Sequence, residues 1–126
     1  MMEKTKLENA IAIKSEFDEH CIVHQSLQLL GNKWTLLVLM SLIKETKRTH
    51  QLLREISGIS TKVLSQTLKK LIGYGMVSKK IYPVVPPSVE YSLTEFGKTL
   101  IPLLDSLFVW ALEHEEQVRK VVKNAE

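Results

Sequence analysis

Residues 58–93 constrain the fold more than any other part of the chain, because they have the pattern of a helix, a glycine break and a hairpin in succession. Ser60 precedes the periodic residues and is a preferred N-cap, since its hydroxyl can accept a hydrogen bond from a backbone N–H at the helix start. Apolar side chains then recur at helical spacing and form one stripe, made of Leu64, Leu68, Leu71 and Ile72. The sequence therefore predicts an amphipathic helix over residues 60–72, which ends at Gly73 and Gly75.

The other side of this predicted helix suits polynucleotide chemistry. It carries Lys62, Ser65, Gln66, Lys69 and Gly73. Lysines bind phosphates, while a glutamine or serine can pair with donors and acceptors on base edges in the major groove. A polar side with lysines is also common on any surface helix, so the helix alone leaves both interpretations open.

The segments before this helix predict a helix-turn-helix. Residues 34–43 are apolar almost all round and predict a central, buried helix, for which Asn32 is a plausible cap. Residues 50–56 predict a shorter amphipathic helix, and residues 57–59 with their glycine make the turn into the helix at Ser60. Two short helices joined in this way form a helix-turn-helix, whose second helix enters the major groove.

The segments after the helix predict a wing. Residues 76–82 are β-prone, residues 83–88 contain three prolines and cannot form a strand interior, and residues 89–93 alternate apolar and polar side chains. The predicted fold class is therefore α+β and mainly α: a winged helix-turn-helix with a two-stranded wing.

Charge is segregated along the chain. Residues 1–32 carry a net charge of −2, residues 33–80 carry +8 and residues 81–126 carry −3, which gives the total of +3. Lysines that only keep a surface soluble would not be concentrated in this way. A basic block over the helix-turn-helix and the first wing strand is instead the pattern expected of phosphate binding.

Three segments resemble the HxlR family of bacterial winged-helix transcription regulators, which is related to the MarR group. They are residues 31–35 (Gly-Asn-Lys-Trp-Thr), residues 58–71 and residues 82–94, which contain Tyr-Pro-Val-Val-Pro-Pro-Ser-Val-Glu-Tyr. The resemblance covers about residues 20–112, and the proline-rich wing is its most specific part. It implies a homodimeric, sequence-specific DNA-binding regulator, usually acting near its own operator, in which N- and C-terminal helices form the dimer interface.

Both ends of the chain have the pattern of oligomerisation elements. Thr94 can cap a long helix whose apolar face is wider than one small winged helix can cover: Phe96, Leu100, Leu103, Leu104, Leu107, Phe108, Ala111 and Leu112. Pro102 predicts a kink or local break in this helix. Residues 7–17 are weakly amphipathic and form a second candidate. For both segments, ordinary packing within one chain is the alternative.

Cys21 is a candidate redox or electrophile sensor. It lies between His20 and His24, and positively charged neighbours favour the reactive thiolate. Some members of the family sense oxidants through an N-terminal cysteine, although this chain has Ile22 where the family usually has proline after that cysteine. The alternative is a buried, inert cysteine. The spacing of the three side chains matches no structural zinc site, so no metal is expected.

The length and composition are those of one domain. At 126 residues and 44% hydrophobic content, we expect a single winged-helix domain: an arm or helix over about residues 1–20, the winged helix-turn-helix over 21–93 and a dimerisation helix over 94–120. No apolar run could span a bilayer and no secretory signal is present. The single cysteine excludes an intrachain disulfide and fits a reducing compartment, so the expected location is the cytoplasm.

The predicted function is that of a homodimeric transcription regulator that binds a specific, pseudo-palindromic double-stranded operator and possesses no cofactor. The residues expected to contact DNA are Ser60, Thr61, Lys62, Ser65, Gln66, Lys69, Lys70, Lys79, Lys80, Pro86, Pro87 and Ser88. The alternative is a winged helix that binds proteins, which would be expected to expose apolar or aromatic anchors where the lysines lie. No catalytic motif is present, so we expect no enzyme activity, and an effector molecule is left open.

Overall fold

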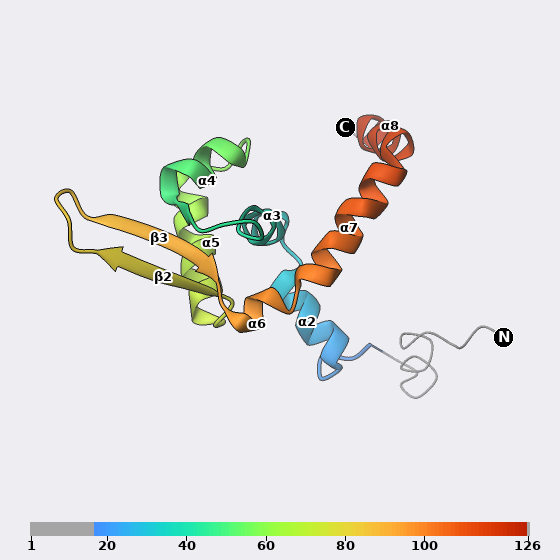
Figure 1. Ribbon diagram of the computed structural model, residues 1–126. Coiled ribbons are helices and arrows are strands. Elements are labelled where there is room, and N and C mark those ends of the chain that lie inside the picture. The colour runs from blue at the N-terminus through green and yellow to red at the C-terminus, as the bar shows by residue number, and fades with distance from the viewer. Residues whose placement is uncertain (1–16, 126) are drawn as a thin grey trace. The chain divides into compact units, whose positions relative to one another are not determined.

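The computed structural model describes residues 17–125 (Figure 1). The chain divides into two compact units between Asn32 and Lys33. The first unit contains one described helix, α2 (Ile22–Leu30), which begins after Cys21. The helix predicted over residues 7–17 lies outside the described residues, apart from Phe17, whose side chain is exposed.

The second unit is a winged helix-turn-helix. Its elements are α3 (Lys33–Ser41), β1 (Lys47–Arg48), α4 (Thr49–Glu55), α5 (Thr61–Gly73), β2 (Val77–Tyr82), β3 (Ser88–Leu93), α6 (Glu95–Lys98), α7 (Ile101–Glu113) and α8 (Glu115–Ala125). Within this unit α3 contacts α4, α5 and α7, while β2 contacts α5 and β3 contacts α4 and α6 (Figure 1). These elements confirm the predicted fold class. Among residues 17–125, no helix is long and apolar enough to cross a membrane.

The core of this unit is built mainly from one side each of α3, α4, α5 and α7. Its fully buried apolar side chains come from α3, α4, α5, β2 and α7: Val38, Leu39, Leu52, Leu64, Leu71, Val77 and Leu104. Each buried leucine contributes about 1.5–3 kcal/mol through the removal of apolar surface from water. The core therefore fixes α5 against α3 and leaves the opposite side of α5 free.

Both ends of α5 follow from the local sequence. The hydroxyl of Ser60 accepts a hydrogen bond from the backbone N–H of Val63 at 3.1 Å, which is the N-cap that the sequence predicts. At the other end, Gly75 adopts a φ of +75° that disfavours any residue with a Cβ. Its N–H donates to the carbonyl of Ile72 and the N–H of Met76 donates to that of Leu71, both at 3.0 Å. This pair of bonds is the Schellman arrangement that turns the chain from α5 into β2.

The wing belongs to a three-stranded antiparallel sheet with the order β1-β3-β2. In the hairpin, Val77 pairs with Leu93 at the base and Tyr82 pairs with Ser88 near the tip. The two-residue strand β1 adds to the outer side of β3, where Arg48 lies opposite Glu90. This third strand is an addition to the two-stranded wing that the sequence predicts, and it joins the wing to the start of α4.

The C-terminal region contains three helices where the sequence predicts one interrupted helix. Thr94 is the expected N-cap, because its hydroxyl accepts from the N–H of Gly97 at 3.0 Å. The helix is interrupted after α6, and Pro102 lies in the first turn of α7. N–H groups in the first turn have no acceptor within the helix, so the missing N–H of proline costs no hydrogen bond there. A second break at His114, which no glycine or proline announces, separates α7 from α8.

Candidate nucleic-acid interface

The outer side of α5 carries the predicted DNA-contacting side chains. Those exposed to solvent are Ser60, Thr61, Lys62, Ser65, Gln66, Lys69 and Lys70, whereas Leu64, Thr67, Leu68 and Leu71 are buried on the other side. Thr67 is the one buried polar residue of this helix. The helix thus offers lysines and hydrogen-bonding side chains on one continuous surface, as the interpretation of α5 as a recognition helix requires.

The turn between α4 and α5 is held by the core. Ile56 and Ile59 are buried on either side of Gly58, which adopts a φ of +86°. A Cβ at Gly58 would lie 3.7 Å from the ring of Trp34, so the backbone conformation, not crowding, is what requires glycine here. This turn sets the angle at which α5 leaves α4.

An ion pair joins β1 to the end of α4. The ammonium of Lys47 lies against the carboxylate of Glu55, and the Lys47 side chain is only 10% exposed. Because a buried charge without a partner is costly, this pair ties the strand before α4 to the last residue of α4. The helix-turn-helix is therefore connected to the sheet at both ends of α4.

The two wing lysines point to opposite faces of the hairpin. Lys79 is paired in register with Tyr91, and Lys80 is paired with Glu90. Since successive side chains of a strand alternate between faces, a DNA duplex lying against one face of the wing would meet one of these lysines and not both. The sequence predicts both as DNA contacts, although consecutive residues of a strand lie on opposite faces.

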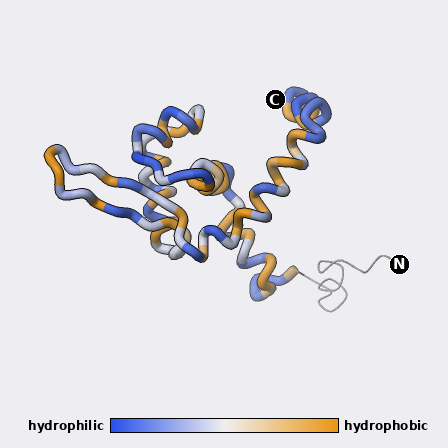
Figure 2. Tube along the Cα trace, viewed as in Figure 1, coloured by the Kyte–Doolittle hydropathy of each residue, from blue (hydrophilic) through white to orange (hydrophobic). Residues whose placement is uncertain are grey.

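The tip of the wing is apolar and exposed. Val85 is fully exposed and Val84 is 53% exposed, and Figure 2 shows the tip as a hydrophobic end on an otherwise mixed hairpin. Apolar side chains at such a position can be inserted against the minor groove of a duplex. Pro86 and Pro87 are exposed beside these valines, as a contact with DNA would need.

A hollow of ≈ 520 Å³ separates the wing tip from the start of α4. It is lined by Arg48, Thr49 and His50 on one side and by residues 84–89 on the other. Ser88 lines it, and its hydroxyl oxygen is buried with no hydrogen-bond partner among the described residues. Arg48 and His50 were missed as site residues by the sequence, because only the pairing of β1 with β3 brings them to the wing.

A network of polar contacts surrounds Arg48. Its Nη2 atom lies 3.6 Å from Oε1 of Glu90, and the hydroxyl of Tyr82 donates to Oε2 of Glu90 at 3.2 Å. The ammonium of Lys80 lies 4.9 Å from the centre of the Tyr82 ring. The backbone N–H of Arg48 also donates to Oε1 of Gln51 at 2.8 Å, in the first turn of α4.

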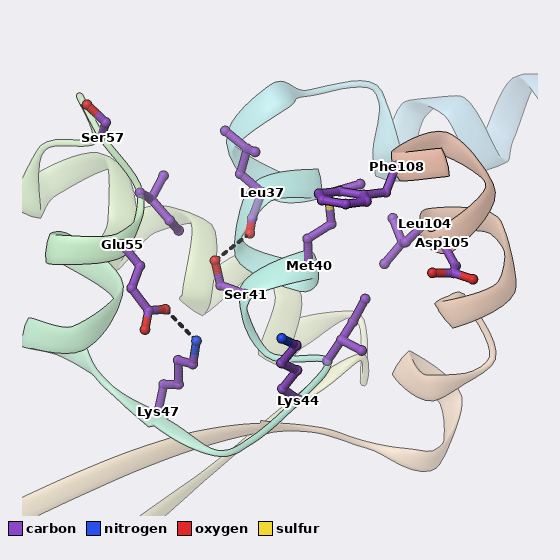
Figure 3. A pocket seen from close by; sticks show the side chains of 12 residues that line it. Leu37, Met40, Ser41, Lys44, Lys47, Glu55, Ser57, Leu104, Asp105 and Phe108 are labelled. Atoms are coloured by element: carbon purple, nitrogen blue, oxygen red, sulfur yellow. Dashed lines mark hydrogen bonds and ion pairs between the residues drawn. The ribbon is translucent and has the colours of Figure 1, made fainter. Parts of the chain in front are cut away.

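A second, larger hollow of ≈ 650 Å³ lies between α3, the end of α4 and α7 (Figure 3). Half of the residues that line it are apolar: Leu37, Met40, Ile43, Ile56, Leu104 and Phe108. The apolar surface continues along α7, where Leu103, Leu107, Phe108, Trp110 and Leu112 are all exposed. This is far from the usual scatter of single exposed apolar residues and has the character of a protein interface.

Cys21 lies in the first unit at the N-cap position of α2. Its side chain is buried, with 5% exposure, and makes no capping hydrogen bond. His20 is exposed, and its Nε2 atom lies 3.6 Å from Oε1 of Glu19. Within residues 17–125, no group of three or more His, Cys, Asp or Glu side chains is placed to hold a metal ion. Cys21 is therefore a buried thiol at the start of α2.

Comparisons with known proteins agree with this geometry. Residues 29–119 match the family described as HxlR-like helix-turn-helix. The HTH-type transcriptional regulator YkvN of Bacillus subtilis is 47% identical over 90 residues, which cover 71% of this chain and 76% of that protein. A solved MarR-family transcriptional regulator from Porphyromonas gingivalis W83 superposes with a TM-score of 0.75 and 43% identity, covering 78% of this chain and 96% of that one. The redox regulator HypR in its reduced form gives a TM-score of 0.73 and 33% identity over 78% and 97% of the two chains.

Proposed function

Because this chain belongs to the HxlR-like helix-turn-helix family of DNA-binding transcriptional regulators, we propose that it reads a specific operator with α5 in the major groove. The observation that carries the proposal is the outer side of α5, where Lys62, Gln66 and Lys69 are exposed together. Gln66 and Ser65 would meet base edges, and Thr61 and the lysines would meet phosphates or bases nearby.

The wing supports the same placement. Its exposed tip, with Pro86 and Pro87, would approach the flanking minor groove or backbone, and Ser88 would lie just inside it. Either Lys79 or Lys80 would add a phosphate contact, according to which face of the hairpin meets the duplex. The proposed activity is binding alone, with no chemical step.

We propose that the regulator works as a homodimer through its C-terminal region, with residues 21–93 reading DNA. One recognition helix covers too few base pairs to specify a site, whereas two read half-sites about one helical turn apart. The apolar surface along α7 offers an interface of the kind that an obligate dimer needs. The operator would then be pseudo-palindromic.

We also propose that the protein responds to thiol-reactive compounds through Cys21. The similar protein HypR is a redox regulator, and Cys21 lies at the start of a helix, where a modification would alter the helix N-terminus.

Selection of bound duplexes from a random pool tests this function. The expected result is a recovered sequence with two related half-sites, whose affinity falls steeply with salt because phosphate contacts release counterions. A protein that binds no duplex even at low salt would contradict the proposal and would favour a winged helix that binds other proteins.

A further inference from the structure

Arg48 and Glu90 form an ion pair beside the proposed DNA surface, although a carboxylate there should repel phosphates. In the antiparallel register, Arg48 of β1 lies directly opposite Glu90 of β3, which lies opposite Lys80 of β2. Directly paired residues project to the same face of a sheet. Three charged side chains are therefore aligned across the wing, and one of them is acidic.

Glu90 is held from two sides. One carboxylate oxygen faces Nη2 of Arg48 at 3.6 Å, and the other accepts from the hydroxyl of Tyr82 at 3.2 Å. The Glu90 side chain is 26% exposed, whereas that of Arg48 is 51% exposed. The carboxylate is thus partly covered and oriented, while the guanidinium extends into solvent.

Arg48 also lines the hollow between the wing tip and α4, together with His50 and Ser88. A guanidinium has five N–H donors in a planar fork, so a contact with one carboxylate leaves donors for a second anion. His50 also lines this space, and an imidazole N–H can donate to an anion there. Glu90 is not among the described residues that line the hollow.

We propose that Arg48 binds a backbone phosphate of DNA at this hollow and that Glu90 is its positioning residue. This inference rests on the proposed DNA binding. The phosphate would lie between the wing tip and the first turn of α4, where Arg48 and His50 meet it from the helix side. Glu90 would hold the guanidinium at the mouth of the hollow, and Tyr82 would hold Glu90.

The sign of one charge substitution separates this role from simple electrostatics. If Glu90 were only an acidic group near DNA, Glu90→Gln would tighten binding, because it removes a repulsion. If Glu90 positions Arg48, Glu90→Gln weakens binding by about tenfold, the loss expected for a hydrogen bond to a charged group. Tyr82→Phe should weaken binding in the same direction without any change of charge.

A double-mutant cycle makes the dependence on Arg48 explicit. Arg48→Ala is expected to reduce the slope of log affinity against log salt by about one phosphate contact. In the Arg48→Ala background, Glu90→Gln should tighten binding, so that the effect of the same substitution reverses its sign. Glu95→Gln is the matched control, since Glu95 is also ion-paired but lies in α6 against Lys98, and its substitution should not weaken binding.

The measurements use the full-length chain with a duplex recovered by selection and with an unrelated duplex. Unfolding curves of each variant show whether a loss of binding reflects a loss of folding. Tighter or unchanged binding by folded Glu90→Gln would overturn the role of Glu90, and an unchanged salt slope in Arg48→Ala would overturn the phosphate contact. Failure of the unaltered protein to bind any duplex would instead contradict the proposed function itself.

Discussion

Gly97 lies so close to the backbone of Met76 that a Cβ on Gly97 would be 2.1 Å from the Met76 carbonyl oxygen. That carbonyl accepts the backbone N–H of Thr94 at 3.0 Å, and the hydroxyl of Thr94 in turn donates to the carbonyl of Gly75. The start of α6 is therefore fitted directly against the turn that ends α5. The absence of a side chain at Gly97 is what permits this contact.

Gly97→Ala should destabilise the protein by about 1–3 kcal/mol or more, because a backbone atom cannot move aside as a flexible side chain can. Gly73→Ala is the matched control. A Cβ at Gly73 meets nothing within 4 Å, and alanine in an exposed helical position should stabilise by about 0.5–1 kcal/mol. Urea unfolding of both variants measures the effect, and equal stability of the two would contradict the contact at Gly97.

The N-cap of α5 separates stability from DNA binding at one residue. Ser60→Ala removes the acceptor for the Val63 N–H and should cost about 1 kcal/mol of the free energy of unfolding. Ser60→Asp keeps a capping oxygen and should retain stability, but it places a negative charge where phosphates approach. We expect Ser60→Asp to fold normally and bind DNA more weakly; normal binding would place Ser60 away from the duplex.

The helix-turn-helix was predictable from the sequence because its determinants are local. Ser60 marks the start of α5 and Gly75 its end, and both do so through hydrogen bonds to residues nearby in the sequence. The helical spacing of the apolar residues determines which side of α5 is buried. Strand β1 was not predictable, since the two residues Lys47 and Arg48 have no periodicity of their own. Their pairing with β3 depends on residues distant in the sequence.

The candidate site divides in the same way. The exposed side of α5 follows from the helical period, whereas the network around Arg48 requires the register of β1 against Glu90. The break at His114 was also unannounced, because neither glycine nor proline occurs there and the helix ends in a backbone conformation that histidine adopts without a special signal. The network around Arg48 thus depends on contacts between distant segments, whereas the contacts at His114 are local: its backbone N–H donates to the carbonyl of Trp110 and its ring stacks on the Trp110 ring.

Base reading and phosphate binding should be separable on α5. Gln66→Ala is expected to cost about 1–3 kcal/mol on the selected duplex and to relax the preference at one base pair. Lys69→Ala should weaken binding to all sequences more evenly and reduce the salt slope by about one. Competition binding with a set of single-base variants measures both. The same uniform loss for the two substitutions would show that Gln66 does not read a base.

Cys21 provides a test of thiol sensing, because the chain contains no other cysteine. Treatment with diamide or an alkylating reagent should change the operator affinity of the unaltered protein and leave that of Cys21→Ser unchanged. Mass spectrometry of the treated protein shows whether the buried thiol has reacted. If Cys21 were modified and the operator affinity did not change, this cysteine would have a structural role only.

The apolar surface of α7 should be needed for dimerisation and not for folding of the monomer. Leu107 is 42% exposed within one chain, so a charge there costs little unless a second chain covers it. We expect Leu107→Glu to be monomeric in sedimentation measurements and to lose most of its affinity for a two-half-site operator, since the second recognition helix is no longer held in place. Val85→Glu, at the fully exposed wing tip, introduces the same charge and should remain dimeric. A dimer that buried an unpaired carboxylate in its apolar centre would lose much of its stability. If Leu107→Glu sedimented as a dimer with normal operator affinity, the α7 surface would therefore not be the dimer interface.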